Sequence, residues 1–330
     1  MDIKVSILIP CYNAKKWIAA SIESALNQTY LNKEIIVVDD GSTDGSLEIV
    51  KSFGDKIIWE TQPNQGGNIT RNNLLKLSTG EWVQYLDADD YLKSEKIANQ
   101  MAIVDKNPSL DIVCSPALTE YHRNGTIEYE SSAGLTPKDP WILLAKWALP
   151  QTGGSLWRKQ AIADVGGWNE ALTCCQEHEL YSRLLIGGKQ FGYLDKSEAI
   201  YRIWSEKTVS RKNPLLPLKN RLKVQDNIEA HLLSIKQMTP ERQRAISQAR
   251  FDCARVLYPQ DQKLAVKLIK KIKKQDSDFV PSGNTSPESY KFLFKTFGFK
   301  VAQGNRIKKR GQNMPESARI FSKKLLSKPA

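Results

Sequence analysis

The sequence lacks any apolar run long enough to cross a bilayer. Its longest apolar stretches, Val5–Pro10 and Ile35–Val38, have the length of buried strands, whereas a membrane-spanning helix needs about 20 apolar residues. The first residues, MDIKVSILIPCYN, also lack the basic region, apolar stretch and cleavage site of a signal peptide. These absences predict a cytoplasmic protein.

Cysteine is scarce, and its positions fit no disulfide or zinc framework. The five positions are Cys11, Cys114, Cys174, Cys175 and Cys253. We expect reduced, mostly buried thiols in a cytoplasmic chain. The chain also lacks low-complexity tracts and repeats, and its 41% hydrophobic and 25% charged residues are typical of globular proteins.

Charge divides the chain into two parts. Residues 1–210 hold 21 basic and 27 acidic residues, a net charge of −6, whereas residues 211–330 hold 27 basic and 9 acidic residues, a net charge of +18. The pattern from Pro214 onward is almost entirely helical. We therefore predict a catalytic domain over residues 1–210 and a basic, mostly helical C-terminal extension over residues 211–330.

The first part alternates strands and helices. The expected elements are strands at Lys4–Pro10, Glu34–Asp40, Ile57–Glu60 and Glu81–Leu86 and helices at Lys15–Gln28, Asp44–Phe53 and Ile69–Ser78. This order predicts an α/β, Rossmann-like fold, with a mostly parallel sheet and helices on both faces. Ligands bind such sheets at the carboxyl ends of the strands, which here means Pro10–Asn13, Asp39–Asp44 and Asp87–Asp90.

Residues 111–210 are less regular. Asn124-Gly125 between two polar-apolar arms indicates a hairpin over Tyr121–Tyr129. Further along, Gln176–Ile186 reads as a helix and Ile200–Trp204 as a short strand.

The strand-end residues suit a nucleotide and a metal ion. Tyr12 can stack on a base, and Asp40 can accept hydrogen bonds from a base or ribose, although residues of this kind also favour plain turns. Asp87 and Asp89 alternate on an extended segment and so face one site. Two such carboxylates suit Mg²⁺ or Mn²⁺ bridged to a diphosphate; the alternative is a polar loop that closes the strand. No GxxxxGK[ST] motif is present, which excludes a P-loop site.

Taken in order, these blocks resemble family 2 glycosyltransferases. The family pattern is matched by Pro10 to Asn13 (P-x-Y-N), Asp39 to Asp44 (D-D-G-S-x-D), Gly66-Gly67 with Arg71-Asn72, and Asp87 to Asp89 (D-x-D). The resemblance covers about the first 210 residues. It implies a GT-A fold with a nucleotide-sugar-binding half at 1–110 and an acceptor-binding half at 111–210.

The resemblance also implies roles for individual residues. The nucleotide-binding set is Pro10, Tyr12, Asn13, Asp40, Arg71 and Asp87. Asp89 is the expected direct ligand of an Mn²⁺ or Mg²⁺ cofactor, with Asp87 beside the ribose and the metal. Arg71 is expected to approach the diphosphate, because its fork of donors suits phosphate oxygens.

The acceptor side is recognisable in the segment GGWNEALTCCQEHELYSRLL. When it is aligned on Arg183 and Leu184, the family's catalytic aspartate falls on Glu177, which becomes the expected general base for the acceptor hydroxyl. His178 is a rival base, and a surface acid on a helix is the plain alternative. Further acceptor-side candidates are Trp168, Gln176 and Glu179.

One departure from the family pattern lies near the end of the domain. Many relatives have Y-R-x-H, where the histidine lies near the diphosphate or the metal, but this chain has Trp204 at that position. Either the enzyme does without that contact, or Arg202 or Lys207 supplies charge. The Q-x-x-R-W motif of processive synthases is absent, so we expect one sugar to be added per encounter.

The C-terminal extension carries two segments with both apolar and basic residues, Gln262–Lys274 and Ala318–Lys328. Such helices can lie on anionic membranes, which would place the protein peripherally on the inner face of the plasma membrane. The alternative is a basic extension packed on the catalytic domain. No nucleic-acid-binding module is present, so we expect no nucleic-acid partner.

The resemblance implies an inverting, metal-dependent and non-processive transfer of a sugar to a glycan or lipid-linked acceptor. The donor is expected to be a UDP-sugar, and the setting polysaccharide or cell-envelope glycan synthesis. One alternative is an inactive glycan-binding or scaffolding relative, although such a protein is expected to lose Asp87, Asp89 or Glu177. The other is a sugar nucleotidyltransferase, which should show a G-x-G-x-R loop where PCYN stands.

Overall fold

A computed structural model describes residues 3–123, 125–131, 134–135, 138–204, 215–283 and 286–312. The chain divides into two compact units, Met1–Gln237 and Met238–Ala330. Among the described residues, no helix has both the length and the apolar character that a membrane span requires. All five cysteines are free, and four of them are buried, as the sequence predicts.

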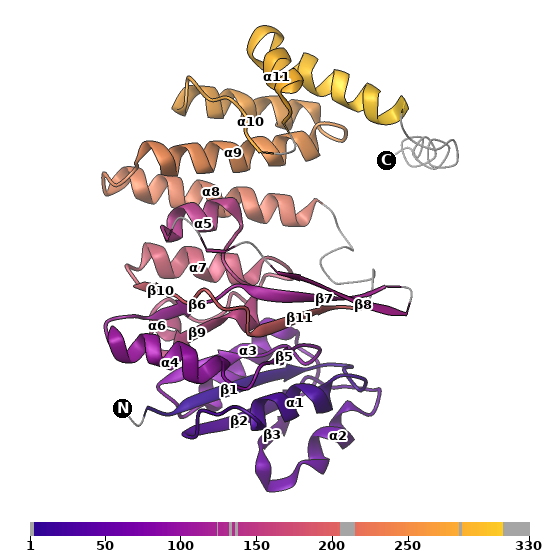
Figure 1. Cartoon of the computed structure of the whole chain (residues 1–330), viewed down its shortest axis with the longest axis vertical. Coiled ribbons are helices and arrows are strands. Elements are labelled where there is room, and N and C mark those ends of the chain that lie inside the picture. Colours follow the sequence, from indigo (N-terminus) through magenta and orange to yellow (C-terminus); the bar gives the residue numbers. More distant parts are fainter. Residues whose placement is uncertain are drawn as a thin grey trace. The chain divides into compact units, whose positions relative to one another are not determined.

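A seven-stranded sheet forms the centre of the first unit (Figure 1). Its strands, in spatial order, are β10 (Phe191–Tyr193), β6 (Ile112–Cys114), β9 (Ser155–Arg158), β4 (Trp82–Tyr85), β1 (Val5–Cys11), β2 (Lys33–Asp39) and β3 (Ile58–Thr61). All neighbours pair in parallel except β9, which runs antiparallel to both β4 and β6. The expected mostly parallel α/β sheet is confirmed.

Helices cover both faces of this sheet, as predicted. On one face, α1 (Ile18–Leu26), α2 (Ser46–Ser52) and α4 (Lys96–Lys106) share a core with alternate strand residues such as Ile7 and Val37. The intervening residues, such as Leu8 and Val38, are equally buried, because α3 (Gly67–Leu77) contacts β1 and β2 from the other side. Strands buried on both faces explain the continuous apolar runs in the sequence.

Three further helices complete the second face and its surroundings. They are α5 (Pro140–Lys146), α6 (Lys159–Asp164) and α7 (Gln176–Ile186). The α6 helix contacts β9 and α7, and α5 contacts α7. The helix predicted over Gln176–Ile186 is confirmed, with the same bounds.

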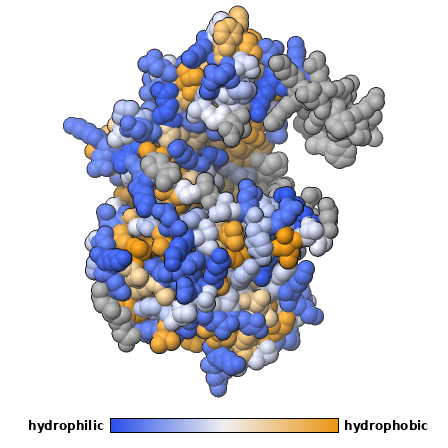
Figure 2. All heavy atoms as spheres, in the orientation of Figure 1, coloured by the Kyte–Doolittle hydropathy of each residue, from blue (hydrophilic) through white to orange (hydrophobic). Residues whose placement is uncertain are grey.

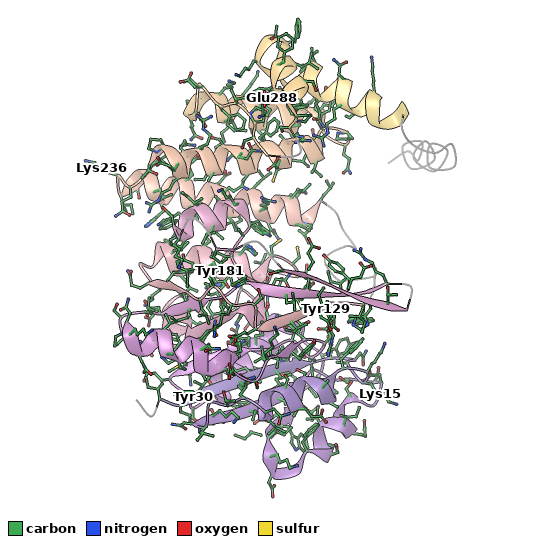
Figure 3. All side chains as sticks on the ribbon, viewed as in Figure 1. Lys15, Tyr30, Tyr129, Tyr181, Lys236 and Glu288 are labelled. Atoms are coloured by element: carbon green, nitrogen blue, oxygen red, sulfur yellow. The ribbon has the colours of Figure 1, made fainter. Side chains whose placement is uncertain are left out.

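A second, four-stranded sheet has the order β5 (Tyr91–Leu92), β11 (Ala199–Ile203), β7 (Ala117–Arg123) and β8 (Thr126–Ser131). The predicted hairpin is confirmed, since β7 and β8 pair antiparallel and Gly125 has a φ of 80°; Asn124 lies outside the described residues. Figure 3 shows Tyr129 on this hairpin. Because β5 directly follows Asp87–Asp90, this sheet is joined to the predicted metal loop.

The first unit ends later than the boundary drawn at residue 210. The helix α8 (Leu216–Ser234) contacts α5 and α7 and buries Val224, Ile228 and Leu232. Burial of those side chains makes α8 part of the first unit, so the division falls after Gln237. Composition alone placed this helix with the basic extension.

The second unit consists of α9 (Pro240–Leu257), α10 (Gln262–Gln275) and α11 (Glu288–Gln312), the last kinked at Gly298. Its core centres on Phe251, whose ring packs against Phe279, Tyr290, Phe294 and Phe299. The apolar face of α10 is buried through Ala265, Leu268 and Ile272. That face is therefore not free to enter a membrane, and Ala318–Lys328 lies outside the described residues.

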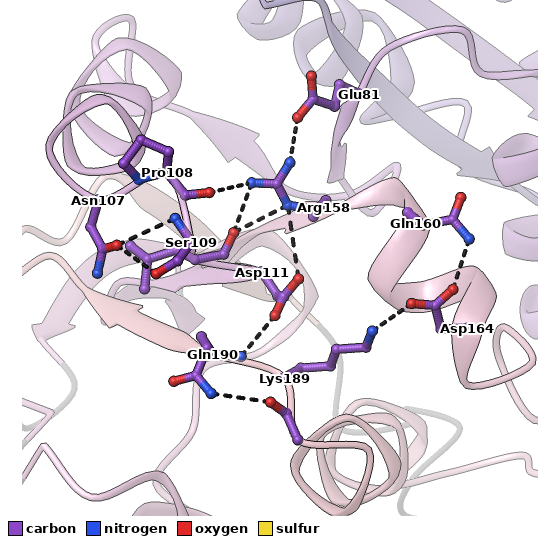
Figure 4. A network of polar contacts seen from close by, with 12 residues as sticks. Glu81, Asn107, Pro108, Ser109, Asp111, Arg158, Gln160, Asp164, Lys189 and Gln190 are labelled. Atoms are coloured by element: carbon purple, nitrogen blue, oxygen red, sulfur yellow. Dashed lines mark hydrogen bonds and ion pairs between the residues drawn. The ribbon is translucent and has the colours of Figure 1, made fainter.

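A polar network fixes β9 in the sheet (Figure 4). Arg158, at the end of β9, donates from Nη2 to the carbonyl oxygens of Pro108 (2.8 Å) and Leu110 (3.0 Å). It also pairs with Glu81, before β4, and its Nε lies 3.8 Å from Asp111 Oδ1, before β6. One guanidinium thus ties the antiparallel strand to both of its neighbours.

We predict that Arg158→Lys lowers the stability of the first unit by about 1–2 kcal/mol, because an ammonium cannot reproduce the planar fork of donors. Urea unfolding followed by tryptophan fluorescence measures this, since all eight tryptophans lie at or before residue 204. Lys189→Met is the matched control, because it removes only the Lys189–Asp164 surface pair of the same region and should leave the midpoint unchanged. Equal midpoints for Arg158→Lys and the wild type would contradict the prediction.

Candidate active site

The predicted site residues meet at the carboxyl edge of β1, β2 and β4. Both β2 and β4 pair with β1 in parallel, with Cys11 opposite Asp39 and Leu8 opposite Tyr85. The backbone N–H of Asp40 donates to the Cys11 carbonyl at 2.8 Å. Parallel pairing therefore brings the loops after the three strands to one edge, as expected from the topology.

Asn13 joins the first two loops. Its backbone N–H donates to Ser42 Oγ (3.0 Å), and its Oδ1 accepts from the Thr43 N–H (2.8 Å). Asn13 has a φ of 48°, a conformation that asparagine tolerates better than most residues. Its observed contacts position the loops, while the neighbouring Tyr12 is 52% exposed. Pro10 lies partly buried near the end of β1.

The two aspartates at the end of β2 have different environments. The Asp40 carboxylate accepts from the N–H groups of Gln65 and Gly66, both at 2.9 Å, and from Gln62 Nε2 at 2.7 Å. It therefore holds the loop that leads into α3. Asp39 Oδ2 accepts from Ser42 and Thr61, whereas Asp39 Oδ1 is buried and has no hydrogen-bond partner among the described residues.

Arg71, on α3, contacts Asp87 and lies beside the ring of Trp168. Its Nη2 donates to Asp87 Oδ1 at 2.7 Å, and its guanidinium lies 5.0 Å from the ring of Trp168. Burial lowers the pKa of Arg71, but the charges of Asp87 and Glu177 outweigh burial and raise this pKa above its usual value. A side chain at Gly67 would crowd Nη1, since its Cβ would lie 3.2 Å away. The glycine leaves room for the guanidinium.

The aspartates after β4 form a strained cluster of negative charge. Burial, followed by repulsion from neighbouring aspartates, raises the pKa of both Asp89 and Asp90 above the usual value. Asp89 Oδ2 accepts from Trp204 Nε1 (3.0 Å), and Asp90 Oδ1 accepts from the Arg202 N–H (2.8 Å). A divalent cation bound to Asp87 and Asp89 would relieve this repulsion, so the residues fit the expected cofactor.

Protein side chains alone do not complete a metal site in the described ranges. No group of three or more His, Cys, Asp or Glu side chains is arranged there to hold a metal ion. A cation at Asp87 and Asp89 would therefore take its other ligands from water and from substrate oxygens, which is how Mg²⁺ is commonly bound beside phosphates. Lys207, one of the two predicted sources of extra charge, lies outside the described residues.

Glu177, the expected general base, lies in the first turn of α7. Its Oε1 accepts from Thr152 Oγ1 at 2.7 Å. Burial and then the charges of Asp90, Asp87, Asp89 and Glu177 raise the pKa of Tyr201 to about 12. Because the charges of Glu177 and of the three aspartates all act on the Tyr201 hydroxyl, Glu177 lies near the loop Asp87–Asp90.

The remaining acceptor-side candidates have mainly structural contacts. His178 is buried and stacks on Trp147 with ring centroids 3.9 Å apart. Burial, together with the charge of Arg221, lowers the pKa of His178 to about 3, so it is held neutral in the core, which disfavours it as a rival base. Glu179 accepts twice from Arg183 (2.9 Å each). Gln176 is half-buried at the start of α7.

Asn72, which follows Arg71 in α3, binds the backbone of Trp168. Its side chain accepts from the Trp168 N–H (2.8 Å) and donates to the Trp168 carbonyl (2.9 Å). This reciprocal pair fixes the loop that places the buried Trp168 ring beside Arg71. Sequence reasoning named Arg71 but gave no role to Asn72, Thr152 or Asp39, because the partners of these residues lie far away in the chain.

Comparisons with known proteins agree with this geometry. The family model Glycosyl transferase family 2 matches residues 6–167. The chain is similar to the Escherichia coli protein named UDP-Glc:alpha-D-GlcNAc-diphosphoundecaprenol beta-1,3-glucosyltransferase WfaP, with 43% identity over 103 residues, 31% of this chain and 41% of that protein. It is also similar to glycosyltransferase GlyA of Streptococcus pneumoniae, with 36% identity over 227 residues, 63% of this chain and 33% of that protein. The chain therefore matches less than half the length of these relatives.

The solved structures extend the similarity in fold beyond the matched family segment. A crystal structure of S. aureus TarS residues 1–349 in complex with UDP-GlcNAc superposes with a TM-score of 0.65 at 19% identity. The superposition covers 91% of this chain and 90% of that chain, so the likeness of fold includes helices of the C-terminal part. Residues 6–167, about half of the chain, therefore belong to glycosyl transferase family 2, within a GT-A type fold.

Proposed function

We propose that this protein transfers a sugar from a nucleotide-sugar donor to a hydroxyl group of a glycan or lipid-linked acceptor, with inversion at the anomeric carbon and with a divalent cation. The observation that carries the proposal is the position of Arg71. It contacts Asp87 directly, and its pKa responds to the charge of Glu177. A donor-side aspartate and the candidate base are thus both close to one buried cation.

The chemistry follows from the charges on this edge of the sheet. Asp87 and Asp89 would hold Mn²⁺ or Mg²⁺, which when bound supplies positive charge against the leaving diphosphate. Arg71 donates to the diphosphate oxygens and stabilises the charge that develops there. Glu177 accepts the proton of the acceptor hydroxyl as that oxygen attacks the anomeric carbon. The Thr152 hydroxyl orients the Glu177 carboxylate.

The comparisons suggest which substrates to test first. TarS is complexed with UDP-GlcNAc, and the E. coli relative is named for UDP-Glc and a diphosphoundecaprenol acceptor. We infer a UDP-sugar donor and a lipid-linked or polymeric glycan acceptor for this chain, in polysaccharide or cell-envelope glycan synthesis.

We expect Glu177→Gln to lower kcat by at least about 100-fold and to leave donor affinity unchanged, because the amide cannot accept the proton. Asp89→Ala should abolish cation-dependent turnover. The measurement is donor hydrolysis and transfer across a panel of nucleotide sugars, with and without Mn²⁺ or Mg²⁺. Glu95→Gln is the matched control, since Glu95 is exposed at the start of α4. A Glu177→Gln enzyme with the wild-type kcat would remove Glu177 as the base.

The orphaned oxygen of Asp39 suggests that Asp39, rather than Asp40, accepts a hydrogen bond from the base. We predict that Asp39→Asn weakens UDP binding about tenfold, because an amide N–H₂ replaces the free acceptor. Asp40→Asn should chiefly lower thermal stability, since its carboxylate holds the Gln62–Gly66 loop. Calorimetric titration with UDP, beside thermal unfolding of both variants, separates the two effects. Full UDP affinity in Asp39→Asn, with a loss in Asp40→Asn, would contradict this prediction and support Asp40, the residue named from the sequence.

Peripheral membrane binding is a separate hypothesis. The lysines of α10 are exposed while its apolar face is buried. The α10 helix can therefore attract a membrane surface only through its positive charge. On α11, however, Phe292 and Phe297 are 62% and 58% exposed and have exposed Lys295 and Lys300 close by in sequence. In Figure 2, hydrophobic and hydrophilic residues mix on the visible surface of the second unit. This combination suits an anionic lipid surface.

We predict that the full chain sediments with vesicles containing anionic lipid and not with neutral vesicles, and that 0.5 M salt releases it, where the Debye length is only about 4 Å. Replacing Phe292 and Phe297 with serine should weaken this binding without affecting donor turnover. The double change Leu233→Ser and Ile235→Ser is the control, because these exposed apolar residues lie in the first unit. Absence of wild-type binding to anionic vesicles would sink the hypothesis.

A further inference from the structure

The residue after β11, Trp204, contacts Asp89, the predicted metal ligand. Trp204 directly follows β11, and its Nε1–H donates to Asp89 Oδ2 at 3.0 Å. In the family pattern this position is held by a histidine, but an indole has no lone pair with which to bind a metal. The hydrogen bond therefore connects Trp204 to the cation site through Asp89 alone.

Arg202 fixes the register in which β11 meets the metal loop. Its backbone N–H donates to Asp90 Oδ1 (2.8 Å), and its Nη1 donates to the Asp89 carbonyl (3.2 Å). From the other side, Glu120 on β7 accepts from Arg202 Nε at 3.1 Å. Both the backbone and the side chain of Arg202 are hydrogen-bonded to residues 89–90. These bonds fix the end of β11, and with it the position of Trp204 beside Asp89.

Ring contacts hold the indole itself. Its centroid lies 6.0 Å from that of Trp17, with the planes tilted by 42°. Trp17 is almost fully buried, contacts His122 edge-on at 5.4 Å and lies 4.9 Å from the guanidinium of Arg202. Trp204 is 46% exposed. It therefore packs on a buried ring while part of its own surface remains exposed.

The open side of Trp204 borders a pocket. With Asn13, Lys15, Lys16, Trp17 and Asp44, it lines a cavity of about 470 Å³. Figure 3 shows Lys15 on the loop at the start of α1. The indole thus lines this cavity while its N–H bonds the Asp89 carboxylate, which is not among the residues that line the cavity.

The hydrogen bond leaves Asp89 able to bind a cation. A carboxylate oxygen has two lone pairs, so the Nε1–H occupies one on Oδ2 and leaves the other, together with Oδ1. A neutral donor adds no positive charge that would repel a cation. It also restricts rotation of the carboxylate, so less conformational freedom remains to be lost when the cation binds.

We propose that Trp204 is a positioning residue for the divalent cation, because its indole N–H fixes the orientation of the Asp89 carboxylate before the donor binds. This inference rests on the proposed function, in which Asp89 is a metal ligand. Its consequence is specific. Loss of the N–H should weaken cation binding and raise the cation concentration needed for turnover, while kcat at saturating cation stays within about twofold of the wild type.

The test is Mn²⁺ binding to the full chain in the presence of UDP, measured by the electron paramagnetic resonance signal of free Mn²⁺. We expect Trp204→Phe to raise the Mn²⁺ dissociation constant about tenfold, as for loss of one hydrogen bond to a charged group. Trp17→Phe alters the same ring cluster but keeps the donor on Asp89, and should stay within twofold.

The outcomes separate the inference from the proposed function. Unchanged Mn²⁺ affinity in Trp204→Phe would overturn the inference, and so would tighter binding, which would mean that the indole competes with the cation. An equal loss in Trp17→Phe would overturn it as well, because packing rather than the N–H would then be responsible. If Asp89→Asn binds Mn²⁺ as well as the wild type does, the cation does not bind at Asp89 and that part of the proposed function fails instead.

Discussion

The ion pair between Arg71 and Asp87 is the contact on which the organisation of the site depends. Parallel pairing of β1, β2 and β4 brings acidic loops to one edge, and Glu177 approaches from α7. Carboxylates this close to one another repel, and burial makes the repulsion more costly. A buried guanidinium that contacts Asp87 at 2.7 Å offsets part of this cost, and the loop held by Asn72 places Trp168 beside it. A cation bound at Asp89 would offset the repulsion that remains around that carboxylate.

The second sheet holds the metal loop from the opposite side. Glu120 accepts from Arg202, His122 and the hydroxyls of Tyr91 and Tyr129. It thereby joins three strands of that sheet to the residue that contacts Asp89 and Asp90. Several hydrogen bonds converge on one buried carboxylate, and such a network resists rearrangement because the loss of its donors would leave the buried Glu120 carboxylate unsatisfied. A rigid frame of this kind is what a cation site needs when few of its ligands come from the protein.

Sequence order predicted the sheet, the helix at Gln176–Ile186 and the convergence of three strand-end loops, because apolar periodicity and motif spacing are local properties. It could not assign the hydrogen bonds of Asp39 and Asp40. Adjacent residues at a strand end point to opposite sides, and which of them is left without a partner depends on Gln65 and Gly66, some 25 residues away. The Trp204–Asp89 contact spans 115 residues. Likewise, α8 belongs to the first unit through its buried face, which net charge does not reveal.

Charge and burial together also restrict what the basic C-terminal part can do. The sequence pattern of α10 suits a membrane surface, yet Ala265, Leu268 and Ile272 are buried within the second unit. Burying these side chains in the folded unit offers the same hydrophobic gain as burying them in lipid, and they cannot do both. Any lipid contact by α10 is therefore electrostatic and sensitive to salt. Apolar insertion depends on side chains that the fold leaves exposed, and on α11 these include Phe292 and Phe297.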